Sequence, residues 1–266
     1  MKFYVTSDLH GFYDQFITTL SNTGWFNDEG PKKLIVCGDL LDRGSQAKEL
    51  VDFMLTLKQK NQLIFIRGNH EDLYLDLLYN FEKYRIQIIT NYCHHISNGT
   101  WDTSLQLADI SEREALSYTD IWRRSNLNSL FRTELIINSI EYYETKNFIF
   151  VHGWIPANAI FDNHSKKHFT YNSNWRKVSN KEWNSARWLC GPNLGIIDKV
   201  LEPNKTIVCG HWNCSAAHHL IDGTSEFEQD ANFNTFKGDG IWALDACTAY
   251  SNKVNIEVIE DAIIDE

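Results

Sequence analysis

The feature that most constrains the fold of this chain is a repeated pattern in which a short apolar run stops abruptly at Asp, Asn or His. The pattern occurs five times, in the segments KFYVTSDLHG, KLIVCGDLLDRG, QLIFIRGNHE, NFIFVHGW and TIVCGHW. Short runs of β-branched and aromatic residues that end near a Gly are typical of buried strands. We therefore predict five strands, each with metal-ligating side chains at its carboxyl end.

Helix-like segments follow the first three of these strands. Residues 13–24, 45–60 and 71–84 carry apolar side chains at helical spacing. The alternation of strands and helices indicates an α/β fold with a mostly parallel sheet, and such sheets bind ligands beyond the carboxyl ends of their strands. We therefore expect the polar ends of the strands to collect in one place.

Composition and pattern favour one large domain. The chain has 266 residues, is 43% hydrophobic and contains nine Trp, fifteen Phe and eleven Tyr, which is enough to bury a large core. Because no repeat or linker divides it, we predict a single domain over residues 1–266. A helical cap or insertion is expected at about residues 85–145, where the pattern becomes helical and irregular. The later segments GIWALDAC and KVNIEVIE are expected in a second sheet.

The charge balance limits the partners. The formal net charge is −10, so a basic surface for extended nucleic acid is not expected, although a small phosphorylated ligand is compatible with it. No apolar run approaches the roughly 18 residues needed to span a membrane. The N-terminal residues show no signal-peptide pattern, and the six cysteines are dispersed. We therefore expect a cytoplasmic protein with free thiols and no membrane partner.

The polar residues at the strand ends form a coherent set of metal ligands. Two Asp, one Asn and three His supply nitrogen and oxygen donors without thiolate, in the order Asp8, His10, Asp39, Asn69, His152 and His211. Such a set suits manganese, iron or zinc. Six side chains exceed what one ion with an open position needs, so we predict a dinuclear centre in which Asp39 bridges the two ions. Manganese is the expected ion, with iron or zinc as alternatives.

Three further residues have types that suit phosphate chemistry. The guanidinium of Arg43, four residues beyond Asp39, matches phosphate oxygens bidentately. His70 follows Asn69 directly and is predicted to protonate the leaving group, with Asp42 keeping it cationic and oriented. Two ions about 3.5 to 4 Å apart can clamp a phosphate and acidify a shared water. We therefore predict a metal-dependent hydrolase of phosphate esters.

The same motifs resemble those of a known family. SDLHG, GDLLDRG, RGNHE, VHG and GHW are similar, in order and spacing, to the motifs of the calcineurin-like metallophosphoesterases, and specifically to the phosphoprotein phosphatase (serine/threonine phosphatase) branch of bacterial and phage type. The resemblance implies a four-layer αββα sandwich of mixed sheets. It also implies that Asp8, His10 and Asp39 hold one metal and that Asp39, Asn69, His152 and His211 hold the other.

The family further uses a second phosphate-binding arginine, for which Arg187 in WNSAR is the candidate, and Glu71 is expected to stabilise the first turn of its helix. Trp154 and Trp212 depart from the common pattern, because relatives often carry smaller residues there. Most tryptophans are expected in the core, but those beside the ligands are candidates for an aromatic wall that stacks on a nucleobase or an aryl ring.

The resemblance leaves the substrate open. The leading hypothesis is a phosphatase that hydrolyses phosphomonoesters of phosphoproteins or small molecules, by attack of a metal-bridging hydroxide on phosphorus with His70 as the general acid. The alternative is a diadenosine tetraphosphate hydrolase, because near relatives with the same motifs cleave that dinucleoside polyphosphate. A non-catalytic metal-binding scaffold is the third hypothesis, although no predicted ligand or acid is missing from the chain. The histidines outside the motifs are expected to have surface or structural roles, and for His94 and His95 on the insertion the alternative is that they line the entrance to the site.

Overall fold

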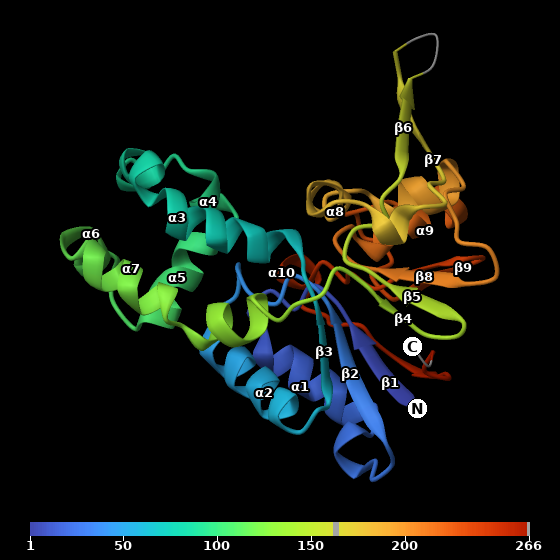
Figure 1. Ribbon diagram of the computed structural model, residues 1–266, viewed down its shortest axis with the longest axis horizontal. Coiled ribbons are helices and arrows are strands. Elements are labelled where there is room, and N and C mark those ends of the chain that lie inside the picture. Colours follow the sequence, from blue (N-terminus) through green and yellow to red (C-terminus); the bar gives the residue numbers. More distant parts are fainter. Residues whose placement is uncertain (162–164, 265–266) are drawn as a thin grey trace.

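A computed structural model describes residues 1–161 and 165–264 and contains two facing mixed sheets (Figure 1). The first sheet has the order β11-β1-β2-β3, in which β1, β2 and β3 are parallel and β11 is antiparallel to β1. Its strands are β1 (Lys2–Thr6), β2 (Lys32–Cys37), β3 (Leu63–Ile66) and β11 (Ile256–Glu260). The three parallel strands are those predicted from the first three motifs.

The second sheet has the order β4-β5-β8-β10-β9. Its central strands β5, β8 and β10 are parallel, and β4 and β9 pair antiparallel at the two edges. The strands are β4 (Tyr143–Glu144), β5 (Phe148–Phe150), β8 (Thr206–Cys209), β9 (Phe236–Gly238) and β10 (Ile241–Ala243). The segment KVNIEVIE was predicted here, and that prediction is wrong: it contains β11, which pairs with β1 in the first sheet.

Both faces of each sheet carry buried side chains, because successive residues of a strand point to opposite faces. In β1, Phe3 and Val5 pack between the two sheets, whereas Tyr4 packs against the helices outside the first sheet. In β8, Val208 joins the layer between the sheets and Ile207 lies on the outer face of the second sheet. Because side chains of a strand point to opposite faces in turn, two sheets covered by helices on their outer faces produce four layers. The predicted αββα sandwich of mixed sheets is confirmed.

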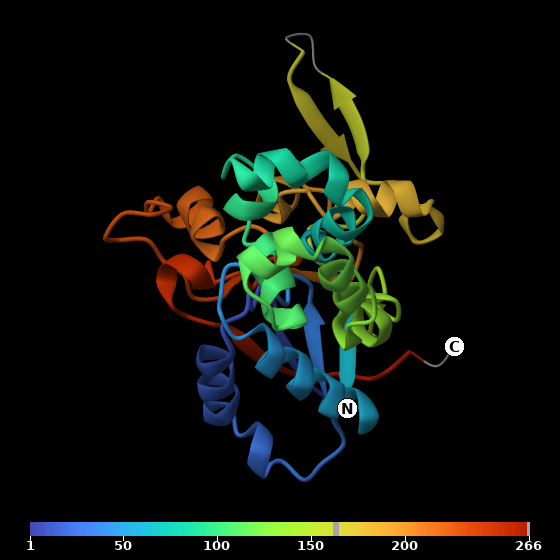
Figure 2. The same cartoon turned by 90° about the vertical axis from the view of Figure 1, so that its left-hand side faces the viewer.

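Helices cover the outer faces and extend beyond the sheets (Figures 1 and 2). They are α1 (Tyr13–Asn22), α2 (Ala47–Gln59), α3 (Asn69–Ile89), α4 (His94–Ser97), α5 (Thr100–Ala108), α6 (Glu112–Ser117), α7 (Thr119–Leu127), α8 (Asn180–Ala186), α9 (Cys214–Asp222) and α10 (Thr248–Ser251). Short 3₁₀ or π turns occupy Trp25–Asn27, Phe131–Ile136, Trp175–Lys177 and Asn193–Ile197. In α2, Leu50, Met54 and Leu57 are buried at helical spacing against the first sheet.

The helices α3 to α7 lie together beside the first sheet, and the end of α3 with α4 to α7 falls within residues 85–145, where a helical insertion is proposed. The long helix α3 begins at the edge of the first sheet, and a non-helical residue at Asn80 kinks it. A hairpin of β6 (Asn158–Phe161) and β7 (Lys167–Thr170) projects from the other side of the molecule (Figure 1). Among the described residues, every helix is too short or too polar to span a lipid bilayer.

Candidate active site

The carboxyl ends of the parallel strands in both sheets converge on one site. The six predicted metal ligands follow these strands: Asp8 and His10 after β1, Asp39 after β2, Asn69 after β3, His152 after β5 and His211 after β8. All of them are buried except His211, which is half-buried. The structure therefore brings together side chains that are up to about two hundred residues apart in sequence, because parallel strands share one carboxyl edge.

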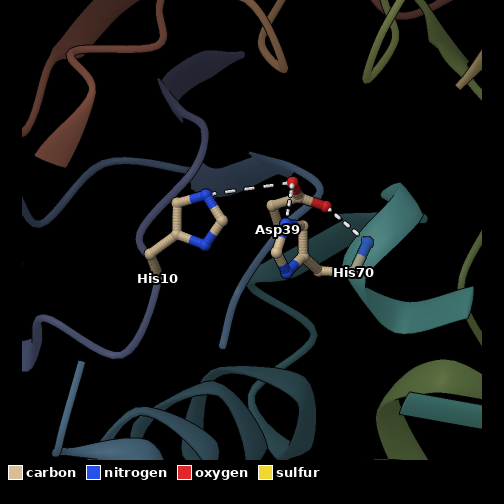
Figure 3. Close-up of side chains that lie close together, drawn as sticks. All are labelled: His10, Asp39 and His70. Carbon is tan, nitrogen blue, oxygen red and sulfur yellow. Dashed lines mark hydrogen bonds and ion pairs between the residues drawn. The ribbon is translucent and has the colours of Figure 1, made fainter. Parts of the chain in front are cut away.

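Asp39 lies at the centre of this site (Figure 3). Its Oδ2 atom is 3.9 Å from His10 Nε2 and 3.8 Å from His70 Nε2, and its Oδ1 atom is 3.3 Å from His152 Nε2. Asp39 belongs to two groups of donor atoms, one with His10 and His70 and one with His152 and His211, and the atoms within each group lie within 4.8 Å of one another. One carboxylate thus faces two clusters of imidazoles.

The two remaining predicted ligands, Asp8 and Asn69, lie beside histidines of the two clusters. Asp8 Oδ1 lies 3.9 Å from His10 Nε2, and Asp8 Oδ2 accepts a hydrogen bond of 2.9 Å from the backbone N–H of His211. Asn69 Oδ1 lies 2.7 Å from His152 Nε2, while His152 Nδ1 lies 2.8 Å from the carbonyl oxygen of Cys37. The Nδ1 contacts of His10 and His152 with backbone carbonyls orient their Nε2 atoms toward Asp39.

The local backbone at this site is strained. Six of the predicted functional residues have a positive φ angle, namely Asp8, His10, Asp39, Asp42, Arg43 and His211. Residues other than Gly adopt this conformation rarely, and it costs about 1 to 3 kcal/mol where it is held. The tight turns after β1, β2 and β8 therefore lower the stability of the backbone, because they hold these side chains in one direction. Strain of this kind is typical of functional sites.

Electrostatics at the site favour a bound cation. Burial, together with the charges of Asp245 and Asp39, raises the pKa of Asp8 well above its usual range. Burial also opposes ionisation of Asp39, but the surrounding histidines outweigh it and hold the pKa of Asp39 below its usual range. Burial lowers the pKa of His152, and burial with repulsion from His152 lowers the pKa of His211 to about 3. Neutral imidazoles beside crowded carboxylates are the donor states that a divalent ion requires.

His70 and Asp42 form a buried pair next to Asp39. His70 Nδ1 lies 2.7 Å from Asp42 Oδ2, and the hydroxyl of Thr100 donates to the same oxygen at 2.8 Å. Burial disfavours the charged imidazole, but Asp39 and Asp42 outweigh it and raise the pKa of His70. The other ring nitrogen, Nε2, points toward the exposed Arg43, whose guanidinium lies 3.4 Å away. The site thus presents a protonatable imidazole and a guanidinium side by side.

Arg187 is buried and held by three neighbours. Its Nε donates to Asp72 at 2.8 Å, and its terminal nitrogens donate to Glu141 and to Asn184. Its side chain is only 3% exposed. These bonds use one N–H of each nitrogen, so both terminal nitrogens retain a second N–H. The guanidinium is therefore fixed in position and lies close enough to His152 to contribute to lowering its pKa.

A family model of calcineurin-like phosphoesterases matches residues 1–223, which include all six predicted metal ligands together with Asp42, Arg43, His70 and Arg187. The chain belongs to the calcineurin-like phosphoesterase family. Its fold is similar to that of a protein serine/threonine phosphatase from Saccharomyces cerevisiae, with a TM-score of 0.50, 16% identity, and coverage of 100% of this chain and 82% of the other. The predicted family is confirmed, and members of this family hydrolyse phosphoester bonds with two metal ions.

Curated relatives of this phosphoesterase match shorter segments. An asymmetrical bis(5′-nucleosyl)-tetraphosphatase PrpE from Anoxybacillus flavithermus is 33% identical over 87 residues, which cover 30% of this chain and 34% of the relative. A serine/threonine-protein phosphatase with EF-hands 1 from Rattus norvegicus is 32% identical over 93 residues, covering 34% of this chain and 14% of the relative. The chain thus spans about a third of the first relative and a smaller share of the second.

In the phosphoesterase site, Glu71 has a larger role than the sequence suggested. Its carboxylate accepts hydrogen bonds from three backbone N–H groups: that of Gly68 at 2.7 Å, that of Asp39 at 3.1 Å and that of Leu40 at 3.0 Å. The first bond caps α3, as expected, and the other two fasten the turn that carries Asp39. A side chain at Gly68 would overlap the backbone nitrogen of Asp39. Glycine and a buried carboxylate therefore hold two ligand loops together.

Glu71→Gln is expected to loosen the Asp39 turn. Burial and the charge of Asp39 raise the pKa of Glu71 to about 7, and the amide of Gln would direct its own N–H groups at a backbone donor. We expect a loss of about 2 kcal/mol in the free energy of unfolding and a metal affinity lower by about 10- to 100-fold. Urea unfolding and metal titration measure both effects, with Glu49→Gln on the exposed face of α2 as the control. Equal affinities in the two variants would contradict the assigned role of Glu71.

A second acidic residue, Asp245, escaped the sequence prediction. It follows β10, it is buried, and its Oδ1 accepts the backbone N–H of Cys247 at 2.7 Å. Burial raises the pKa of Asp245 to about 6, and its charge contributes to the raised pKa of Asp8. The signal was present in the segment GIWALDAC, in which an apolar run again stops at Asp.

The tryptophans near the ligands divide into two kinds. Trp154 is buried and its indole N–H donates to the carbonyl oxygen of Val200 at 3.0 Å, so it is a core residue. Trp212 is 42% exposed and Trp188 is 51% exposed, and the rings of both lie about 6 Å from the ring of His211 at steep angles. Of the two tryptophans considered for an aromatic wall, Trp154 is therefore a core residue, whereas Trp212 stays a candidate and Trp188 joins it.

Proposed function

We propose that this chain is a hydrolase of phosphoric esters that uses two divalent metal ions. The observation that carries the proposal is the position of Asp39, whose two oxygens face two separate clusters of imidazole nitrogens. Such a carboxylate is suited to bridging two ions. The relatives named above, which act on phosphate compounds, support the same class of chemistry.

The residues fit two metal sites that share Asp39. Asp8 and His10 with Asp39 would hold one ion, and Asn69, His152 and His211 with Asp39 would hold the other, by atoms that already face one another across the site. Oxygen and imidazole donors without thiolate favour manganese, with iron or zinc as alternatives. When bound, the ions would bind phosphate oxygens and lower the pKa of a water. The protein supplies their positions and the surrounding protonation states.

The other side chains would complete the reaction. His70, whose pKa is raised by Asp39 and Asp42 against the effect of burial, would give the proton on Nε2 to the leaving oxygen. Arg43 lies beside that nitrogen, where a phosphate oxygen between the two groups would receive hydrogen bonds from both. Arg187, fixed by Asp72 and Glu141, would provide a second guanidinium with the N–H groups that these partners leave unused.

Phosphomonoesters of phosphoproteins or small molecules are the proposed substrates. A dinucleoside tetraphosphate is the second candidate, and two observations favour it. Several curated relatives bear the name bis(5′-nucleosyl)-tetraphosphatase. In addition, Trp188 and Trp212 both expose their indoles next to His211, where they would stack on a nucleobase.

A comparison of three substrates distinguishes these candidates. The metal-free protein is reconstituted with manganese and offered an aryl phosphate, a phosphoserine peptide and diadenosine tetraphosphate at equal concentration. We expect manganese-dependent hydrolysis of the two monoesters. Preference for the dinucleotide would instead support the second candidate, and Trp188→Ala and Trp212→Ala would then raise KM for it by about 5- to 100-fold. If none of the three substrates is hydrolysed, the non-catalytic metal-binding scaffold becomes the favoured hypothesis.

A further inference from the structure

A second group of metal-ligating side chains lies in the helical segment, outside the active site. Asp76 is on α3 before its kink, and His94 and His95 are the first two residues of α4. Asp76 Oδ2 is 3.3 Å from His95 Nε2 and 4.0 Å from His94 Nε2, and the donor atoms of the three residues lie within 4.8 Å of one another. No residue of this group belongs to the motifs at the strand ends.

His95 is the residue that indicates a ligand. Its side chain is fully buried, and neither of its ring nitrogens has a hydrogen-bond partner among the described residues. Buried polar groups are nearly always satisfied, and leaving one unpaired costs about 1 to 3 kcal/mol. Nε2 of His95 faces the carboxylate of Asp76 and lacks hydrogen-bond geometry to it. A ligand between the two groups would satisfy both.

The carboxylate of Asp76 is held in place by two side chains of α3. The hydroxyl of Tyr84 donates to Oδ2 at 2.7 Å, and the side-chain amide of Asn80 donates to Oδ1 at 2.8 Å. Both partners lie at or beyond the kink of α3. Carboxylates and imidazoles that ligate metals are typically oriented by such outer hydrogen bonds. The kinked helix therefore fixes the direction in which Asp76 presents its oxygen to α4.

We propose that Asp76, His94 and His95 form a separate binding site for a divalent transition metal ion of the zinc class. Two imidazole nitrogens and one carboxylate oxygen are a common set of protein ligands for such an ion. Bonds of about 2.0 to 2.2 Å place neighbouring tetrahedral donors about 3.3 Å apart, which matches the distance between Asp76 and His95 and is shorter than the 4.0 Å between Asp76 and His94. The bound ion would join α4 to α3.

Protonation and access agree with this site. Burial, together with the neighbouring His94, lowers the pKa of His95 to about 4, so its ring is neutral at physiological pH. His94 is exposed, with 45% of its side chain accessible, and it borders a surface hollow of about 520 Å³ that is also lined by Tyr92 and Cys93. The side chain of Asp76 is also 36% accessible, so an ion and a water for its fourth position can reach these two ligands from solvent.

The test compares zinc content between matched variants of the full chain. Metal-free protein is equilibrated with excess Zn²⁺, desalted and measured by mass spectrometry of the metal. We expect His94→Gln to hold one zinc per chain fewer than the wild type, and His219→Gln, which removes an exposed histidine at the end of α9, to match the wild type. Because the result is a difference, the number of ions at the proposed active site does not affect it.

A second measurement locates the ion in the wild type itself. In the wild type labelled with ¹⁵N, Zn²⁺ is expected to shift the ring-nitrogen resonance of His95, and Asp76→Asn is expected to remove that shift. Equal zinc content in His94→Gln and the wild type would overturn the proposal. A missing zinc in His94→Gln combined with an unshifted His95 resonance in the wild type would also overturn it, because the ion would then lie elsewhere.

Discussion

Asp39→Asn is expected to abolish metal-dependent hydrolysis and to remove at least one ion from the active site. Asn has nearly the same shape as Asp and can still accept the backbone N–H of His70, which donates to Oδ1 at 2.9 Å. The turn should therefore survive, while the charge between the imidazole clusters disappears. Without that charge, the position between the two clusters would no longer be anionic, and two cations would repel each other at short range. Metal content and the rate of aryl phosphate hydrolysis measure the effect.

The control for this variant is Asp52→Asn, which changes an exposed carboxylate on α2. It should retain the metal content and rate of the wild type. Circular dichroism of Asp39→Asn would establish that the fold is intact. If Asp39→Asn kept both ions and more than about a tenth of the rate, a loss of under 1.4 kcal/mol in transition-state stabilisation, Asp39 would not be the bridging residue.

His70→Asn is expected to retain both ions and to lower kcat by about 100- to 10,000-fold, the range for loss of a general acid. His70 contacts Asp42 and faces Arg43, but the predicted ligand sets do not include it. Its contribution should depend on the leaving group. An aryl phosphate releases a weakly basic phenolate that needs little protonation, whereas a phosphoserine peptide releases a strongly basic alkoxide. The decrease in kcat should therefore be larger for the peptide.

The corresponding control is His219→Asn, which alters an exposed histidine of α9. Metal content is measured in both variants together with kcat for the two substrates. Equal losses for the aryl phosphate and the peptide would indicate that His70 positions the phosphate rather than donating a proton. Loss of a metal ion would place His70 among the ligands, an arrangement that its distance of 3.8 Å from Asp39 Oδ2 also permits.

The strand ends were predictable because two local signals coincide there. An apolar run such as Leu63–Ile66 favours burial, whereas the residues that follow it are polar. The carboxyl end of each strand can therefore be recognised from the sequence alone. Parallel strands share a carboxyl edge, which explains why the clustering of the six ligands could also be expected. The family resemblance added the four-layer arrangement, which periodicity alone does not distinguish from other α/β folds.

Contacts between segments that are far apart in the sequence could not be predicted from such local signals. Glu71 looked like a helix cap, because its bonds to the Asp39 turn join residues 31 and 32 positions apart in sequence. Arg187 could be named as a candidate, but only packing shows that Asp72 and Glu141 hold it. The burial of Trp154 and the exposure of Trp212 likewise depend on which neighbours the folded chain supplies. The same holds for His95, whose ring nitrogens lack a hydrogen-bond partner within the described part of the chain. Residue type and local periodicity determine strands, helices and candidate ligands, whereas burial, pairing and charge balance arise only when separate segments meet.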